Sequence, residues 1–95
     1  MMDLAGYTFP ENRAAIVCNH VWEGHPVLLF AHDSDGDIQF YWGDDSHSIS
    51  DALVLGLGEI KEHVQSMQDA PTVRPGFCAE RLELGGRWMV RKMED

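Results

Sequence analysis

Apolar residues gather in short runs along this 95-residue chain, and polar segments rich in Gly, Pro or Asp separate the runs. Residues 14–22 (AAIVCNHVW) are rich in β-branched and aromatic side chains, which predicts a first strand. Gly24 and Pro26 predict a turn, so residues 27–32 (VLLFAH) are expected to return as the second strand of a hairpin. Because this second run is apolar on both faces, we expect it to be a central strand.

The polar segment DSDGD leads from the second predicted strand to a third one. Asp35-Gly36 is a strong signal for a two-residue type I′ turn, in which both central residues need a positive φ. In residues 38–42 (IQFYW), the isoleucine, phenylalanine and tryptophan share the inward face, and Gln39 and Tyr41 share the other. The pattern therefore predicts a three-stranded meander.

The segment after the meander predicts a strand or turn and then a helix. Residues 52–57 (ALVLGL) fit either a fourth strand or a short helical turn capped by Ser48 or Ser50. Apolar residues recur at helical spacing across 58–68, which predicts a short amphipathic helix that Pro71 prevents from continuing.

The last two runs predict a second hairpin. Residues 77–84 (FCAERLEL) and 87–92 (RWMVRK) read as strands, and Gly85-Gly86 joins them. The expected fold class is a small α+β domain with a mainly antiparallel sheet of five or six strands and one short amphipathic helix. We expect a single domain over 1–95, in which an N-terminal extension (1–13) precedes the core (14–91).

Composition agrees with an ordinary globular protein, because hydrophobic residues make up 44% and charged residues 24% of the chain. The N-terminus lacks the basic and apolar regions of a signal peptide, and no apolar run is as long as a membrane span. We therefore expect a cytoplasmic protein with no membrane partner. Cys18 and Cys78 lie in apolar stretches, which is typical of reduced core thiols.

The charge is strongly negative, since 16 acidic residues outnumber 7 basic ones and give a net charge of −9. Residues 14–73 contain ten acids and one base, Lys61, whereas five bases and four acids follow from Arg74 onward. Such a field repels nucleic acid and attracts basic proteins at a rate that salt reduces. We predict a basic protein partner and no nucleic-acid binding; the alternative is that the acidity serves solubility alone.

Five aspartates in residues 32–45 (HDSDGDIQFYWGDD) suggest possible chemistry. An EF-hand calcium loop is disfavoured, because Gly36 stands at position four from Asp33 and the sharp bend needs glycine at six. Asp33 and Asp35 match the nucleophile and general acid–base of the D-x-D-G motif in haloacid dehalogenase-type phosphatases. A chain this short cannot build the layered core of that family, so a hairpin turn with solvated carboxylates is preferred.

Four further residues have the chemistry of zinc ligands: Cys18, His20, His25 and His32. No C-x-x-C or H-x-x-x-H spacing accompanies them, so we predict no metal site and no cofactor. The chain also lacks a P-loop and the G-x-G-x-x-G, G-x-S-x-G and H-E-x-x-H motifs, so we predict no catalytic residues.

Aromatic residues beside acids predict a protein-binding surface, because aromatic side chains are favoured anchors and acids select a basic partner. The alternative is that the three tryptophans, including Trp88, are core residues, and for Trp22 and Trp88 this alternative is preferred. The residues predicted to bind a partner are Trp22, Glu23, Asp35, Asp37, Tyr41, Trp42, Asp44 and Asp45.

Three segments, VCNHVWEGHPVLLFAHDSDGDIQFYWG, ALVLGLGEI and PGFCAERLELGGRW, resemble small bacterial domains of the immunity-protein-like superfamily of polymorphic toxin systems. The resemblance implies a compact, largely β protein without known catalytic residues that binds and neutralises a toxin. Many relatives carry a cysteine soon after the third strand's phenylalanine, where this chain has Tyr41-Trp42-Gly43, and this departure weakens a zinc or thiol role. The matching positions are Trp22-Glu23, Asp35-Gly36-Asp37, Phe40, Gly76, Ala79-Glu80-Arg81 and Trp88.

The function predicted from these observations is that of a non-enzymatic protein-binding domain, an immunity-like protein that neutralises a basic toxin through an acidic surface. Two alternatives stay open. One is a small metal- or phosphate-dependent hydrolase that uses Asp33 and Asp35, and the other is a structural or adaptor domain.

Overall fold

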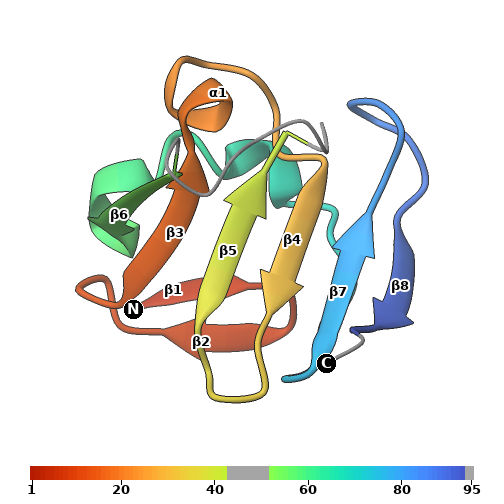
Figure 1. Cartoon of the computed structure of the whole chain (residues 1–95), viewed down its shortest axis with the longest axis horizontal. Coiled ribbons are helices and arrows are strands. Elements are labelled where there is room, and N and C mark those ends of the chain that lie inside the picture. The colour runs from red at the N-terminus through yellow and green to blue at the C-terminus, as the bar shows by residue number, and fades with distance from the viewer. Residues whose placement is uncertain (43–51, 94–95) are drawn as a thin grey trace.

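A computed structural model describes residues 1–42 and 52–93 (Figure 1). It contains a six-stranded sheet of order β6-β3-β5-β4-β7-β8 and a separate two-stranded sheet, β1-β2. Every strand pair is antiparallel except β3–β5, so the predicted α+β class with a mainly antiparallel sheet is confirmed. The elements are β1 (Met2–Leu4), β2 (Tyr7–Phe9), β3 (Ala14–Cys18), α1 (Asn19–Trp22), β4 (Leu29–His32), β5 (Ile38–Tyr41), β6 (Ala52–Gly56), the 3-10 helices η2 (Leu57–Ile60) and η3 (Gln65–Met67), β7 (Phe77–Glu80) and β8 (Met89–Lys92).

The first predicted hairpin is wrong. The strand predicted over 14–22 ends at Cys18, and Asn19–Trp22 form one helical turn that the bond from the Glu23 N–H to the Asn19 carbonyl closes at 2.9 Å. After this turn, β4 does not return beside β3. Instead β5 lies between them and pairs with β3 in parallel.

The predicted pairing of the second and third strands is confirmed, because β4 and β5 form an antiparallel hairpin. As predicted, β4 is central, lying between β5 and β7. Phe30 and Phe40 stand opposite each other in these strands and are fully buried. Their face of the sheet packs against the β1–β2 hairpin and the 3-10 segments, which lie behind the sheet in Figure 1.

The N-terminal residues, expected as an extension, belong to this core. Met2, Leu4 and Phe9 are buried in the same cluster as the residues of the main sheet. Ala5 and Gly6 connect β1 to β2 with φ of 49° and 83°, the positive values of a type I′ turn. The turn is bonded to the segment between η3 and β7, because the Val73 N–H donates to the Ala5 carbonyl at 2.9 Å.

Residues 58–68 do not form the predicted amphipathic helix. They belong instead to η2, a turn and η3, yet Leu57, Ile60, Val64 and Met67 are all buried. The pairs 57/60 and 64/67 are each three residues apart, which is the repeat of a 3-10 helix. The apolar spacing was therefore compatible with two short 3-10 turns as well as with one α-helix. Residues 52–57, left open between a strand and a helical turn, contain β6, whose five residues pair with β3.

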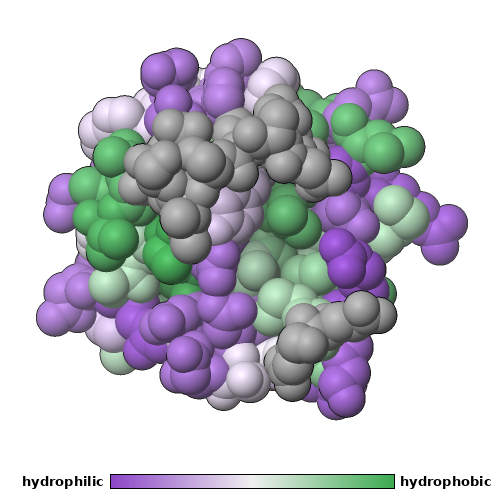
Figure 2. Space-filling view, in the orientation of Figure 1, coloured by the Kyte–Doolittle hydropathy of each residue, from purple (hydrophilic) through white to green (hydrophobic). Residues whose placement is uncertain are grey.

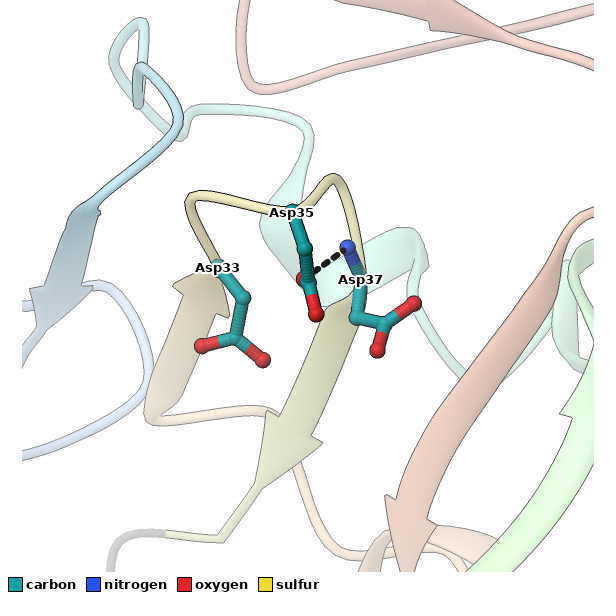
Figure 3. A group of neighbouring side chains, drawn as sticks. All are labelled: Asp33, Asp35 and Asp37. Carbon is teal, nitrogen blue, oxygen red and sulfur yellow. Dashed lines mark hydrogen bonds between the residues drawn. The ribbon is translucent and has the colours of Figure 1, made fainter.

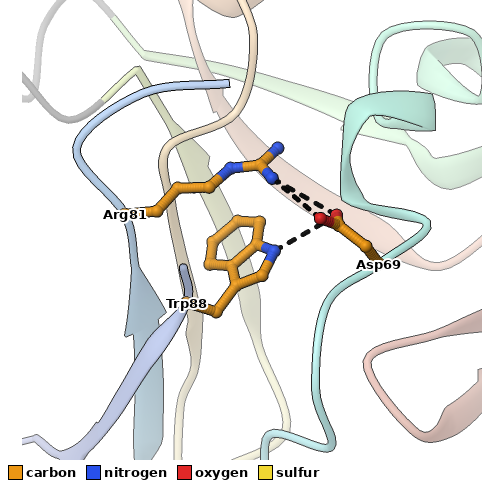
Figure 4. A network of polar contacts seen from close by, with 3 residues as sticks. All are labelled: Asp69, Arg81 and Trp88. Carbon is orange, nitrogen blue, oxygen red and sulfur yellow. Dashed lines mark hydrogen bonds and ion pairs between the residues drawn. The ribbon is translucent and has the colours of Figure 1, made fainter. Parts of the chain in front are cut away.

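The second predicted hairpin pairs as expected, but its loop is longer. Strands β7 and β8 are antiparallel, yet β7 ends at Glu80 and β8 begins at Met89, so Gly85-Gly86 is not a two-residue turn. Arg81 directly follows β7, and its side chain, only 1% exposed, reaches Asp69 at 3.2 Å. Trp88 covers the Arg81 guanidinium at 4.2 Å from the ring centroid and donates its indole N–H to Asp69 at 3.2 Å (Figure 4).

The Asp69 cluster (Asp69, Arg81 and Trp88) joins the segment after η3 to the loop between β7 and β8. The indole hydrogen bond of Trp88 and the positive charge of Arg81 hold the pKa of Asp69 below its ordinary value. Trp88 is half-buried and packs against the core without being one of its buried residues, so the core alternative holds for it only in part. Both cysteines are buried free thiols, as predicted. Within 1–42 and 52–93, none of the helices has the length and apolar character needed to cross a membrane.

Candidate functional site

The acidic turn, residues 33–37, connects β4 to β5 at one end of the sheet. The Asp33 N–H donates to the Asp37 carbonyl at 2.8 Å, and the Gly36 N–H donates to the Asp33 carbonyl at 2.9 Å. Only Gly36 has a positive φ, 96°, so the predicted type I′ turn is wrong. The bonds instead define a three-residue loop, a type I turn followed by a left-handed glycine.

The turn brings three carboxylates together. Asp33, Asp35 and Asp37 each offer an oxygen, and these oxygens lie within 4.8 Å of one another. Figure 3 shows the three side chains leaving the turn toward the same side. A carboxylate oxygen of Asp35 accepts the Asp37 N–H at 3.1 Å, which holds two of the three residues in a fixed relation. Asp35 and Asp37 are exposed and Asp33 is half-buried.

A fixed, exposed group of carboxylates attracts cations, either the ammonium or guanidinium of a protein or a metal ion. One positive charge is already near, because the Arg13 guanidinium donates to the Gly36 carbonyl. Arg13 therefore offsets part of the negative charge and holds the turn against the residues that precede β3. Sequence reasoning missed this contact, since it assigned Arg13 to an extension outside the core.

A polar chain leads from the acidic turn along one face of β5. The Gln39 amide nitrogen donates to a carboxylate oxygen of Asp33 at 2.6 Å, and the Tyr41 hydroxyl donates to the Gln39 oxygen at 2.5 Å. Burial raises the pKa of Tyr41 most, and the negative charges of Cys18 and Asp33 raise it further. Gln39 and Tyr41 share the face that their alternation in the sequence predicted.

The predicted aromatic residues lie around α1, where β3 and β5 end. Trp22 is 41% exposed and stacks on His63, with ring centroids 4.6 Å apart and an interplanar angle of 13°. Trp42 contacts two imidazoles, His20 at 5.1 Å and His25 at 4.5 Å between centroids. Trp22 is therefore neither a core residue, as preferred from the sequence, nor a free anchor, because one face of its indole is covered.

The residues predicted to bind a partner do not form one surface. Asp35 and Asp37 precede β5 and Trp42 follows it, so these acids and Trp42 lie at opposite ends of this strand, whereas Tyr41 is connected to Asp33 through Gln39 (Figure 1). Trp22 and the exposed Glu23 belong to the α1 end. Asp44 and Asp45 lie outside the described residues.

The four possible zinc ligands are also dispersed. The Cys18 thiol accepts the Trp42 N–H at 3.3 Å, and the His20 and His25 rings lie 5.7 Å apart near α1. His32 is buried on the core side of the sheet, where its Nδ1–H donates to the Val73 carbonyl at 2.8 Å. Among residues 1–42 and 52–93, the acidic turn alone brings three or more metal-ligating side chains together.

Comparison with known proteins found no matching family model, no matching curated protein and no matching solved structure. The resemblance to immunity-like domains therefore stays a prediction from the sequence.

Proposed function

We propose that this chain is a non-enzymatic, cytoplasmic domain that binds a basic protein through the acidic turn. The observation that carries the proposal is the convergence of three carboxylates within 4.8 Å on a hydrogen-bonded, exposed hairpin turn. A lysine or arginine of a partner would supply the missing counter-charge without any rearrangement of the turn, which keeps the cost of ordering low. The net charge of −9 would speed the encounter with such a partner.

The face of β5 extends this contact area. Gln39 and Tyr41 are half-buried and connected to Asp33, so their positions are fixed before binding. A preordered tyrosine beside carboxylates is a favoured anchor in protein interfaces. The α1 end lies too far along β5 to belong to the same small contact, and the proposal does not require it.

The immunity-like role follows from this proposal together with the sequence resemblance. An immunity protein blocks a toxin by covering it, which requires complementary shape and charge and no catalysis. A basic toxin, such as a nuclease with a positively charged substrate groove, is the kind of partner that an acidic turn would select.

A divalent cation is the second candidate ligand of the acidic turn, because clustered carboxylates are the ligands that Ca²⁺ and Mg²⁺ prefer. The Arg13 guanidinium, bonded to the Gly36 carbonyl, brings a positive charge beside the turn, and this charge repels a divalent cation more than a singly charged side chain. We therefore rank a partner's basic side chain above a metal ion.

Two variants with the same change in net charge test the proposal. Asp33→Asn, Asp35→Asn and Asp37→Asn together remove the charge of the turn and keep its hydrogen-bonding oxygens. The control combines Asp3→Asn, Glu62→Gln and Glu83→Gln, exposed acids elsewhere in the fold. From extracts of the native host, the unmodified protein and the control should retain a basic protein that about 0.5 M salt releases, and the turn variant should retain about tenfold less.

Equal losses in both variants, or retention of no basic protein by the unmodified chain, would contradict the proposal. Calorimetric titration with Ca²⁺ and Mg²⁺ separates the second candidate. Stoichiometric binding that the turn variant loses, together with no retained protein, would assign the turn to a cation instead.

A further inference from the structure

The two edges of the main sheet differ in how they are protected. Strand β8 forms one edge, and its exposed Arg91 and Lys92 discourage pairing with another strand, as charged side chains on natural edge strands do. Strand β6 forms the other edge and reads ALVLG, without a charged residue or a proline. No strand among the described residues pairs with its outer edge.

The β6 edge is also regular and apolar. All five of its residues pair with β3 in an unbroken register, so no bulge turns the edge aside. Val54 is 70% exposed and Leu53 is 37% exposed. Figure 2 shows hydrophobic surface on the side of the molecule where Figure 1 places β6. An edge of this kind is a template for a further strand.

We propose that a second copy of this chain occupies the β6 edge, so that two β6 strands pair antiparallel across a twofold axis and join the two main sheets. Val54 is the middle residue of β6, and a symmetric register places Val54 opposite Val54 of the second copy. Leu53 then stands opposite Leu55, and Ala52 opposite Gly56. The strand therefore meets itself without a charged residue at any position, and its three central residues are apolar.

Glu11 and Glu59, the acids that contact the C-terminal end of β6, do not meet their own counterparts in this arrangement. Glu59 bonds to the Gly56 N–H at 3.5 Å, and the Glu11 carbonyl accepts the Gly58 N–H at 2.8 Å, so both acids lie at the C-terminal end of β6. Antiparallel pairing puts these ends at opposite extremes of the interface, about 13 Å apart for a five-residue strand, which exceeds a Debye length of about 8 Å. Pairing of two β8 strands would instead place Arg91 and Lys92, which belong to the strand itself, inside the interface, and β6-to-β8 pairing would not close.

The dimer should be weak, with a Kd of roughly 10–100 µM, because a single short strand pair is a small interface. Salt should strengthen it, since it screens the repulsion between two acidic chains and does not weaken apolar contacts. Salt should therefore strengthen the dimer but weaken the binding of the basic partner proposed above. The acidic turn is not part of the dimer interface. Success or failure here is therefore independent of that proposal.

Sedimentation equilibrium from about 10 µM to about 1 mM tests the proposal. The unmodified protein should dimerise, Val54→Lys should remain monomeric, and the control Val90→Lys, on exposed β8, should dimerise like the unmodified chain. Because the symmetric register sets residue 54 against itself, an equal mixture of Val54→Lys and Val54→Glu should regain the dimer. Thermal unfolding checks that each variant is folded.

Three results would overturn the proposal: a monomeric unmodified protein at about 1 mM, a Val54→Lys variant that dimerises as tightly as the unmodified chain, or a Lys–Glu mixture that associates no better than its components. Loss of the dimer in Val90→Lys would move the interface to β8 and would equally overturn it.

Discussion

Tyr41 is connected to the acidic turn through Gln39, so the pKa of its hydroxyl depends on the charge of the turn. Its phenol is half-buried and bonded at 2.5 Å to an amide that is itself bonded to Asp33. Burial is the largest cause of the raised pKa, followed by the charges of Cys18 and Asp33. The folded state therefore holds the phenolic proton more tightly than the unfolded chain, and this contribution to stability is present below pH 10.0 and lost as the pH rises through the raised pKa.

In a Tyr7→Phe background, where Tyr41 is the remaining tyrosine, ultraviolet absorbance should show a phenol that titrates above 10.0. Adding Asp33→Asn should lower this pKa without restoring 10.0, because burial, the largest cause of the raised pKa, persists. Asp3→Asn, on β1, serves as the control and should leave the titration unchanged. A phenol that titrates at or below the ordinary value, or one that Asp33→Asn shifts upward, would contradict the polar chain described for β5.

The residues of the acidic turn could be predicted from the sequence only in part. The Asp-Gly pair correctly predicted a β4–β5 hairpin, but it does not distinguish a two-residue loop from a three-residue loop, since both need a left-handed glycine. Alternation within β5 correctly placed Gln39 and Tyr41 on one face. The contact of Arg13 with the turn could not be predicted, because it depends on parallel pairing of β3 with β5.

Among the elements, the β1–β2 hairpin depends on one close approach of the backbone to its neighbour. Gly6 has φ of 83°, and a Cβ at this position would lie 2.3 Å from the Thr72 hydroxyl oxygen. Gly85, in the loop between β7 and β8, has nearly the same φ, 81°, but nothing lies within 4 Å of a Cβ there. The two glycines therefore separate backbone strain, which they share, from steric exclusion, which only Gly6 experiences.

Gly85→Ala should lower the free energy of unfolding by about 1 kcal/mol, the cost of a left-handed alanine. Gly6→Ala should lower it by about 1–3 kcal/mol more, because Thr72 must also move. Urea denaturation measures both, and the additional change Thr72→Gly should recover part of the loss in Gly6→Ala. Equal effects of the two alanines would show that the hairpin does not dock closely on the segment before Val73.

The elements that sequence patterns missed are those decided by distant contacts. β1 and β2 have three residues each, too few for a periodic signal, and they are ordered by burial against the main sheet. The predicted pairing of β3 with β4 was wrong because we assumed a hairpin between strands that are adjacent in sequence. The helical turn at Asn19–Trp22 could not be predicted from the sequence, because it is four residues long and belongs to a run whose β-branched residues favour a strand.

At the scale of the whole molecule, the repulsion between the carboxylates of the acidic turn lowers the free energy of unfolding. Carboxylates within 4.8 Å of one another repel by about 1 kcal/mol per pair in water at low salt, and the turn contains three such pairs. Arg13 relieves part of this repulsion, and part persists in the unfolded chain because the residues are close in sequence. A net stabilisation of about 1–2 kcal/mol is therefore expected when the turn is neutralised.

Urea denaturation of the triple variant Asp33→Asn, Asp35→Asn and Asp37→Asn should show this gain at about 10 mM salt and lose most of it at about 0.5 M, where screening acts over about 4 Å. The control of Asp3→Asn, Glu62→Gln and Glu83→Gln changes the net charge equally but removes scattered acids, so its gain should be smaller. A turn variant no more stable than the control would mean that Arg13 already neutralises the turn. If the turn variant is instead more stable and also loses the basic partner, stability and binding change in opposite directions, as expected of residues retained for function at a cost in stability.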